Sequence, residues 1–246
     1  MIRVVADNIS KDFSIGYRKE ESALSAVLSF LPKSYPKRIL VALKNISFSV
    51  DSGKVLGLVG KNGSGKSTLL RIIAGIYQPT QGVAKTVGKT IYLTGLGQGL
   101  SPMLTMRENI FLMGSIMGLG QKDIKNKFNE IVDFSGLNDF VDTKVAHFSS
   151  GMITRLNFSV MINSLKHHNP DVILLDEVFG SGGDIDFQGK AIQKMEELIK
   201  GGATVVMASH DLEIIKKYCD KVILLNKGEV AFMGQPDEAI KLYLKS

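Results

Sequence analysis

The residues best suited to chemistry lie in a glycine-rich turn at positions 60–68. The turn reads Gly-Lys-Asn-Gly-Ser-Gly-Lys-Ser-Thr and fits the pattern G-x-x-x-x-G-K-[ST]. Its glycines let backbone N–H groups close on an anion, and the helix that follows adds the partial positive charge of its N-terminus. We expect Lys66 to reach the β- and γ-phosphates of a nucleotide and the Ser67 hydroxyl to ligate Mg²⁺. The predicted nucleotide-binding residues of this turn are Gly60, Asn62, Gly63, Ser64, Gly65, Lys66, Ser67 and Thr68.

Two adjacent carboxylates form the second chemical signal. The run Asp-Val-Ile-Leu-Leu-Asp-Glu at 171–177 places Asp176 and Glu177 directly after an apolar strand. Open α/β sheets bind ligands at the carboxyl ends of their strands. We therefore expect Asp176 to hold Mg²⁺ through its hydration shell and Glu177 to act as general base on the attacking water.

Two further positions can meet a phosphate. Ser149, Ser150, Gly151 and Met152 open a helical pattern, which gives a second helix N-terminus with free hydroxyl groups. One nucleotide pocket needs only one such terminus. Two copies packed head-to-tail, each covering the ATP of the other, would explain why the chain has two helix N-termini suited to phosphate. His210 follows the apolar strand 203–208 and can hydrogen-bond a γ-phosphate. The other histidines, at 147, 167 and 168, have no such placement and are expected to be surface or packing residues.

Composition limits the class of protein. The 246 residues are 44% hydrophobic and 22% charged, with a net charge of +6. The basic residues are scattered, so we predict no nucleic-acid surface. No run of 18 apolar residues and no signal peptide is present, and the single cysteine, Cys219, suits the cytosol and is expected to be a buried filler.

The elements that position these residues follow an α/β pattern. Strands are expected at 2–13 (an edge strand), 41–50, 54–59, 172–175, 203–208 and 221–225, with helices at 69–75, 187–200 and 211–218. A turn at 79–82 and a mobile glycine-rich connection at 88–100 separate the two halves. A capping box at Thr105–Glu108 opens a helical insert of about 101–166, and a hairpin at 226–228 precedes a last helix near Tyr243.

An amphipathic segment at about 20–31 has two interpretations. Its apolar residues recur at helical spacing, and Lys33, Lys37 and Arg38 follow it. Such a helix can lie at a membrane interface, and it can equally pack on the core of its own chain.

At this point the chain resembles the nucleotide-binding subunit of an ABC transporter, over essentially all 246 residues. The resemblance implies one ABC-type P-loop NTPase domain with a mixed sheet core, an antiparallel β subdomain and a helical subdomain. Residues 60–68 match Walker A, 172–176 match Walker B, Glu177 is the catalytic glutamate and His210 the switch histidine. Ser-Ser-Gly-Met at 149–152, Leu-Gly-Gln-Gly-Leu at 96–100 and Arg-Glu-Asn-Ile at 107–110 are similar to the ATPases of bacterial polysaccharide exporters.

That narrower resemblance implies partners and a place in the cell. It implies an ATP- and Mg²⁺-dependent homodimer on the cytoplasmic face of the inner membrane, bound to two copies of a transmembrane permease. The permease would handle a lipid-linked polysaccharide, O-antigen before teichoic acid or capsule, and no nucleic acid. The segment 20–31 resembles a helix at the membrane surface, and the carbohydrate-binding domain that some O-antigen exporters append has no counterpart in this sequence.

The same resemblance carries over three further positions. The Q-loop residue falls on Gly95, with Gln98 nearby, and the D-loop aspartate is Asp184 in a loop one residue longer than usual. The aromatic residue that stacks on adenine is Phe13 or Tyr17, and Phe13 is favoured.

Three alternatives remain at this stage. They are an ABC-type ATPase of nucleic-acid maintenance or another transport system, a P-loop kinase for a small molecule, and an ATP-gated clamp without turnover.

Overall fold

The computed structural model describes residues 1–15, 38–94, 99–178 and 185–245. Four predicted features lie outside these residues. They are Tyr17, the segment 20–31, the Q-loop positions Gly95 and Gln98, and the D-loop residue Asp184.

A six-stranded sheet forms the centre of the chain, in the order β5-β6-β7-β3-β8-β9. All neighbours pair in parallel except β8 and β9, which form the predicted C-terminal hairpin. Every residue of β3, β6 and β7 is buried, as expected for parallel strands covered on both faces. This arrangement confirms the α/β class. The strands are β3 (Val55–Val59), β5 (Thr90–Thr94), β6 (Val172–Asp176), β7 (Thr204–Ala208), β8 (Lys221–Asn226) and β9 (Glu229–Gly234).

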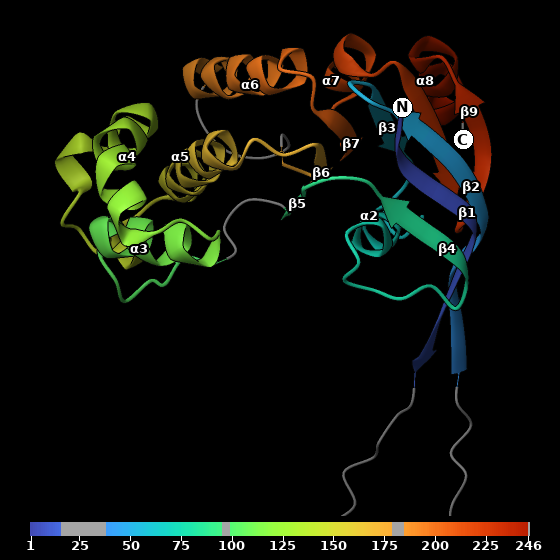
Figure 1. Ribbon diagram of the computed structural model, residues 1–246, viewed down its shortest axis with the longest axis horizontal. Coiled ribbons are helices and arrows are strands. Elements are labelled where there is room, and N and C mark those ends of the chain that lie inside the picture. Colours follow the sequence, from blue (N-terminus) through green and yellow to red (C-terminus); the bar gives the residue numbers. More distant parts are fainter. Residues whose placement is uncertain (16–37, 95–98, 179–184, 246) are drawn as a thin grey trace, which may run out of the picture.

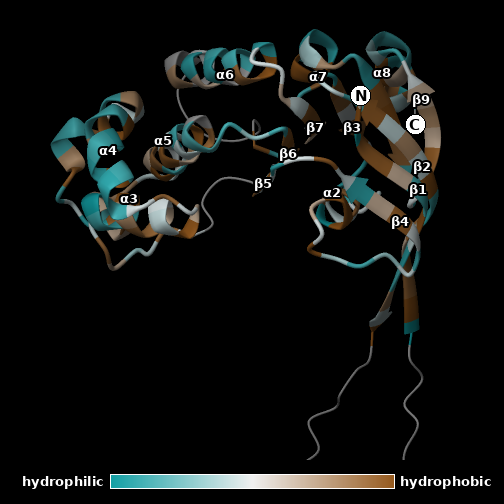
Figure 2. Ribbon diagram, in the orientation of Figure 1, coloured by the Kyte–Doolittle hydropathy of each residue, from teal (hydrophilic) through white to brown (hydrophobic). Residues whose placement is uncertain are grey.

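Different layers cover the two faces of this sheet (Figure 1). One face packs against α6 (Ile185–Lys200), α7 (Leu212–Tyr218), α8 (Pro236–Leu244) and part of α5 (Ser150–His168). The other face packs against α2 (Lys66–Ile73) and the smaller sheet. Figure 2 shows hydrophobic residues concentrated in the strands of both sheets, whereas α4 (Gln121–Ser135) and α6 are mainly hydrophilic.

The smaller sheet is antiparallel, in the order β2-β1-β4, and corrects one prediction. Its strands are β1 (Ile2–Ile15), β2 (Arg38–Asp51) and β4 (Gln81–Thr86). The first strand was expected at an edge, but β1 lies in the centre because β4 pairs with its second side. The alternation that suggested an edge arises because one face of β1 packs on the core, where Val4, Ala6 and Ile9 are buried.

Two strands lie where the sequence predicted only turns and a mobile connection. β4 begins at Gln81, inside the predicted turn, and β5 occupies Thr90–Thr94 within the glycine-rich stretch. β4 has no strong apolar run, and each strand pairs with one distant in sequence, β4 with β1 and β5 with β6. Local sequence therefore carries a weak signal for β4, whereas Thr-Ile-Tyr-Leu-Thr at 90–94 favours a strand and was overlooked among the surrounding glycines.

The helical insert has a core of its own. It comprises α3 (Met106–Ile116), α4 and the first half of α5, which extend away from both sheets in Figure 1. Ile110, Ile124, Ile131, Leu156 and Val160 are buried together in it. The predicted capping box opens α3, since Thr105 accepts from the backbone N–H of Glu108 and the Glu108 carboxylate accepts from that of Thr105. No helix among the described residues combines the length and the apolar character needed to cross a membrane.

Cys219 is buried, as predicted, and its environment gives a test of the fold. A Cβ added to Gly57 would lie 2.8 Å from its Sγ, so the thiol fills the space above β3. Burial raises the pKa of the Cys219 thiol to about 12. Because the thiolate is the reactive form, the native protein holds roughly a thousandfold less thiolate at pH 8 than an exposed cysteine of ordinary pKa near 9 would.

We therefore expect Cys219 to react with Ellman's reagent very slowly in native buffer and at once in denaturant, as followed by absorbance. Rapid stoichiometric reaction of the native protein would contradict this packing.

Candidate nucleotide-binding site

The phosphate-binding turn joins a buried strand to a helix, as its sequence predicted. β3 ends at Val59 and α2 begins at Lys66. Gly63 and Gly65 have φ angles of 78° and 107°, which side chains with a Cβ rarely adopt. A Cβ on Gly65 would also lie 2.8 Å from the carbonyl oxygen of Ala42. The turn therefore needs glycine both for its backbone conformation and for its contact with β2.

The polar groups of this turn fit an anion. Lys66 is only 5% exposed, and its Nζ donates to the carbonyl oxygens of Gly60 (2.7 Å) and Lys61 (3.2 Å). Burial lowers the pKa of Lys66, while Glu177 and Asp176 act in the opposite direction. The buried Ser64 hydroxyl has no hydrogen-bond partner within the described part of the chain. A buried cation beside an unsatisfied donor is the arrangement that a bound phosphate would complete.

A cavity of about 470 Å³ opens above the turn, with two chemically different ends. Residues 62–68 and Glu177 form the polar end. Phe13, Leu40 and Val41 form the apolar end, where Phe13 packs edge-on against Tyr77 at 5.6 Å between ring centroids. A triphosphate at one end and a planar base at the other match this division.

The strand β6 brings Asp176 to the first turn of α2. The Ser67 hydroxyl donates to Oδ1 of Asp176 at 2.9 Å, and Asp176 is 5% exposed. A hydroxyl and a carboxylate this close suit Mg²⁺, which can take Ser67 as a ligand and Asp176 through a bound water, together with phosphate oxygens. The residues present therefore fit the Mg²⁺ expected from the sequence.

Tyr92 belongs to the same cluster and was not predicted from the sequence. Its hydroxyl donates to Oδ2 of Asp176 at 2.9 Å. Burial raises the pKa of Tyr92 to about 12, with Arg71 lowering it and the Asp176 charge raising it, so the hydroxyl keeps its proton. Tyr92 was missed because β5 was not predicted. Only the pairing of β5 with β6, with Thr94 opposite Asp176, reveals that Tyr92 lies beside the carboxylate.

Glu177 and His210 meet at the ends of neighbouring strands. Glu177 has a φ of 56°, unusual for a residue with a side chain, and its backbone N–H donates to the carbonyl of Ala208. Its Oε1 lies 2.8 Å from Nε2 of His210. Asp211 caps α7 by accepting from the N–H groups of Glu213 and Ile214, which fixes the backbone next to His210. The two side chains are 44% and 42% exposed, so the contact faces solvent in a single chain.

The predicted second anion site lies elsewhere in the same chain. Ser149 caps α5 by accepting from the N–H of Met152 at 3.2 Å, and Ser149 and Ser150 are exposed. Ser149, Ser150, Gly151 and Met152 do not line the cavity above the phosphate-binding turn. Within one chain, then, the structure brings together Lys66, Ser67, Asp176, Glu177 and His210, but not residues 149–152.

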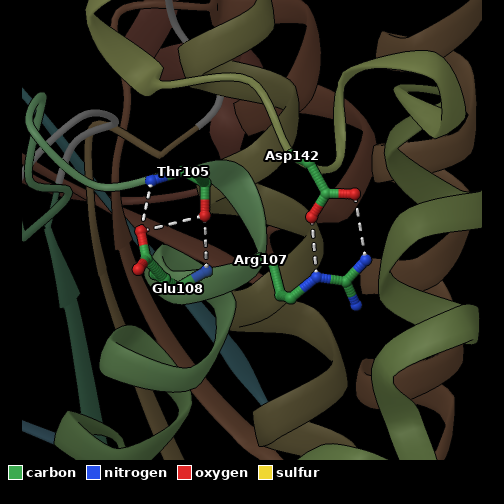
Figure 3. Close-up of polar contacts among 4 residues, drawn as sticks. All are labelled: Thr105, Arg107, Glu108 and Asp142. Atoms are coloured by element: carbon green, nitrogen blue, oxygen red, sulfur yellow. Dashed lines mark hydrogen bonds and ion pairs between the residues drawn. The ribbon is translucent and has the colours of Figure 1, made fainter.

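A backbone ladder joins the start of α3 to the segment before α5. The N–H groups of Met106 and Val145 donate to Thr143 and Leu104, and that of Ala146 donates to Pro102, each at 3.0 Å. Figure 3 shows the side chains beside this ladder, the Thr105–Glu108 capping box and the Arg107–Asp142 ion pair of 2.8 Å. The ion pair is largely exposed and contributes little on its own. The cap and the ladder therefore fix the start of α3 against residues 141–146, which lie shortly before residues 149–152 in the chain.

A phosphate-binding turn, a strand-end Asp–Glu pair and an inserted helical arm define a P-loop ATPase of the ATP-binding cassette type. The model of the family described as ABC transporter matches residues 43–180, more than half of the sequence. The chain belongs to the ABC transporter family, in which it is an ATP-binding ATPase subunit. This membership removes the small-molecule kinase and the clamp without turnover from the alternatives.

The relatives and solved structures agree with this assignment. The chain is 38% identical to the ABC transporter protein AbcA of Aeromonas salmonicida, covering 98% of this chain and 76% of AbcA. It is 37% identical to the O-antigen export system ATP-binding protein RfbB of Klebsiella pneumoniae, covering 84% and 82%. The dimeric post-hydrolysis ATP-binding cassette MJ0796 with ADP and Pi has the same fold, at a TM-score of 0.71 and 24% identity over 95% of this chain and 98% of that one.

The capping box of α3 gives a test of the helical arm. Thr105→Ala removes the side-chain acceptor for the Glu108 N–H and should lower the free energy of unfolding by about 1 kcal/mol. Thr105→Ser is the matched control, because it keeps the hydroxyl. Urea titration followed by circular dichroism measures both, and equal midpoints for the two variants would show that the cap contributes nothing.

Proposed function

We propose that this chain is the ATP-hydrolysing subunit of a bacterial exporter that moves a lipid-linked polysaccharide, with O-antigen as the first candidate. The observation that carries this proposal is the 37% identity to the Klebsiella pneumoniae O-antigen export ATP-binding protein across 82% of that protein. Teichoic acid is the second candidate. The Lactococcus lactis teichoic acids export ATP-binding protein TagH is 38% identical over 99% of this chain, which spans only 51% of TagH.

The proposed nucleotide site assigns a role to each end of the cavity. Residues 60–68 bind the phosphates, Lys66 neutralises the β- and γ-phosphates, and Phe13 stacks on the adenine. Ser67 and Asp176 hold Mg²⁺, which when bound would offset the negative charge of the phosphates. The observed apolar and polar halves of the cavity support this orientation of ATP.

Glu177 and His210 form the proposed hydrolytic pair. Glu177 lines the cavity next to the phosphate-binding turn, where it can orient a water molecule and accept its proton. His210 Nε2 lies 2.8 Å from the Glu177 carboxylate and can hold it in that position. The positive φ of Glu177 accompanies a change in contacts, since Asp176 faces Ser67 and Tyr92 whereas Glu177 faces His210.

Two copies of the chain complete each site in this proposal. The γ-phosphate bound by one copy meets residues 149–152 of the other, namely Ser149, Ser150, Gly151 and Met152. ATP then favours the closed dimer, because only in that state does the nucleotide contact both copies. The positions assigned to the Q-loop, Gly95 and Gln98, and to the D-loop, Asp184, belong to the same proposed interface. The exposure of the helix tip and its absence from the cavity lining of its own chain support an arrangement between copies.

The partner in this proposal is a transmembrane permease, present in two copies at the cytoplasmic face of the inner membrane. Closing and opening of the ATPase dimer would drive outward movement of the polymer through that permease. The relatives named as ATP-binding proteins of export systems support a transport role over nucleic-acid maintenance.

The variant Glu177→Gln tests the hydrolytic step. It removes the proposed base while keeping the size of the side chain, so phosphate release should fall by about a hundredfold or more. ATP affinity, measured with a fluorescent analogue, should stay close to that of the unmodified protein. Undiminished phosphate release would refute the assignment of Glu177.

The same variant tests the transported substrate in the host cell. A strain that carries only Glu177→Gln should lack the polymer at its surface and accumulate the lipid-linked form inside, as shown by immunoblotting of cell fractions. Normal surface polysaccharide in that strain would contradict the export proposal while leaving the ATPase assignment intact.

A further inference from the structure

Asp176 is held at both carboxylate oxygens by different parts of the chain. Its Oδ1 accepts from Ser67 on α2, and its Oδ2 accepts from Tyr92 on β5, each at 2.9 Å. β5 lies next to β6 at one edge of the central sheet (Figure 1), with Tyr92 paired to Leu174 and Thr94 to Asp176. The carboxylate therefore cannot rotate without breaking at least one of these contacts.

Arg71 extends this arrangement back to the phosphate-binding helix. Arg71 lies one turn after Ser67 on α2 and interacts with the Tyr92 hydroxyl, which raises the pKa of the Arg71 guanidinium. Its guanidinium also lies 5.7 Å from the ring centre of Tyr77. α2 thus supplies the direct donor to Asp176, Ser67, and also carries Arg71, which lowers the pKa of the Tyr92 hydroxyl.

Packing alone does not account for the Tyr92 hydroxyl. The ring of Tyr92 is partly buried against the core on the α2 side of the sheet, which a phenylalanine ring could fill equally well. The hydroxyl instead donates to a carboxylate that is 5% exposed. A hydrogen bond to an ionised acceptor in such surroundings is stronger and more directional than one to a neutral group.

We propose that Tyr92 is a positioning residue for the metal–nucleotide site, and that its hydroxyl holds Oδ2 of Asp176 so that Oδ1 stays directed at Ser67. This inference rests on the proposed function, since it assumes that Ser67 and Asp176 share Mg²⁺. Residues that hydrogen-bond to the groups around a metal orient those groups, and their loss typically lowers metal affinity by about tenfold or more.

The matched variants are Tyr92→Phe and Tyr218→Phe. Each removes one tyrosine hydroxyl that donates to a carboxylate. Tyr218 donates to Oε1 of Glu196 at 2.5 Å, and neither of these residues lines the cavity. Binding of a fluorescent, non-hydrolysable ATP analogue is titrated with Mg²⁺, and separately in EDTA. For Tyr92→Phe we expect the Mg²⁺ concentration at half-maximal binding to rise about tenfold, with affinity in EDTA unchanged. Tyr218→Phe should change neither quantity.

Two outcomes would overturn the role of Tyr92. One is an unchanged Mg²⁺ requirement in Tyr92→Phe, and the other is an equal loss of affinity with and without Mg²⁺, which indicates a packing role for the ring. If the unmodified protein binds the analogue equally well in Mg²⁺ and in EDTA, the metal site of the proposed function fails instead, and the role of Tyr92 fails with it.

Discussion

The contact between Ser67 and Asp176 is the constraint on which the rest of the site depends. It joins the first turn of α2 to the end of β6, two elements that lie more than a hundred residues apart in the chain. Parallel strands place their carboxyl ends at one edge of the sheet, so β3, β6 and β7 deliver the phosphate turn, the Asp–Glu pair and His210 to the same place. The buried strands give that edge its rigidity, since their side chains are packed on both faces.

The sequence predicts the parts of the site that depend on local pattern. β3 and β6 are short apolar runs followed by glycines or carboxylates, and the Thr105 capping box is visible as a spacing of three residues. The parts that depend on distant pairing could not be read in this way. β4 carries few apolar residues, and the glycines around β5 conceal its strand-favouring sequence. β1 pairs with a strand on each side, and Tyr92 gains its partner only through the β5–β6 register.

The two halves of the molecule differ in what holds them together. The sheet region has a continuous core on each face of the central sheet, whereas the helical arm has a separate core centred on Ile110, Ile124 and Leu156. The backbone ladder from 102–107 to 141–146 makes the start of α3 and the approach to α5 one unit. The start of α3 and residues 141–146 should therefore move together, which suits the proposed contact of this arm with a second copy.

The proposed sharing of each site by two copies can be tested through the mass of the Glu177→Gln protein in solution with ATP and Mg²⁺, measured by light scattering. We expect a particle of twice the mass of one chain, and a return to the single-chain mass when Ser150→Arg is added. A Glu177→Gln protein that binds ATP yet keeps the single-chain mass, or a dimer indifferent to Ser150→Arg, would contradict the shared site.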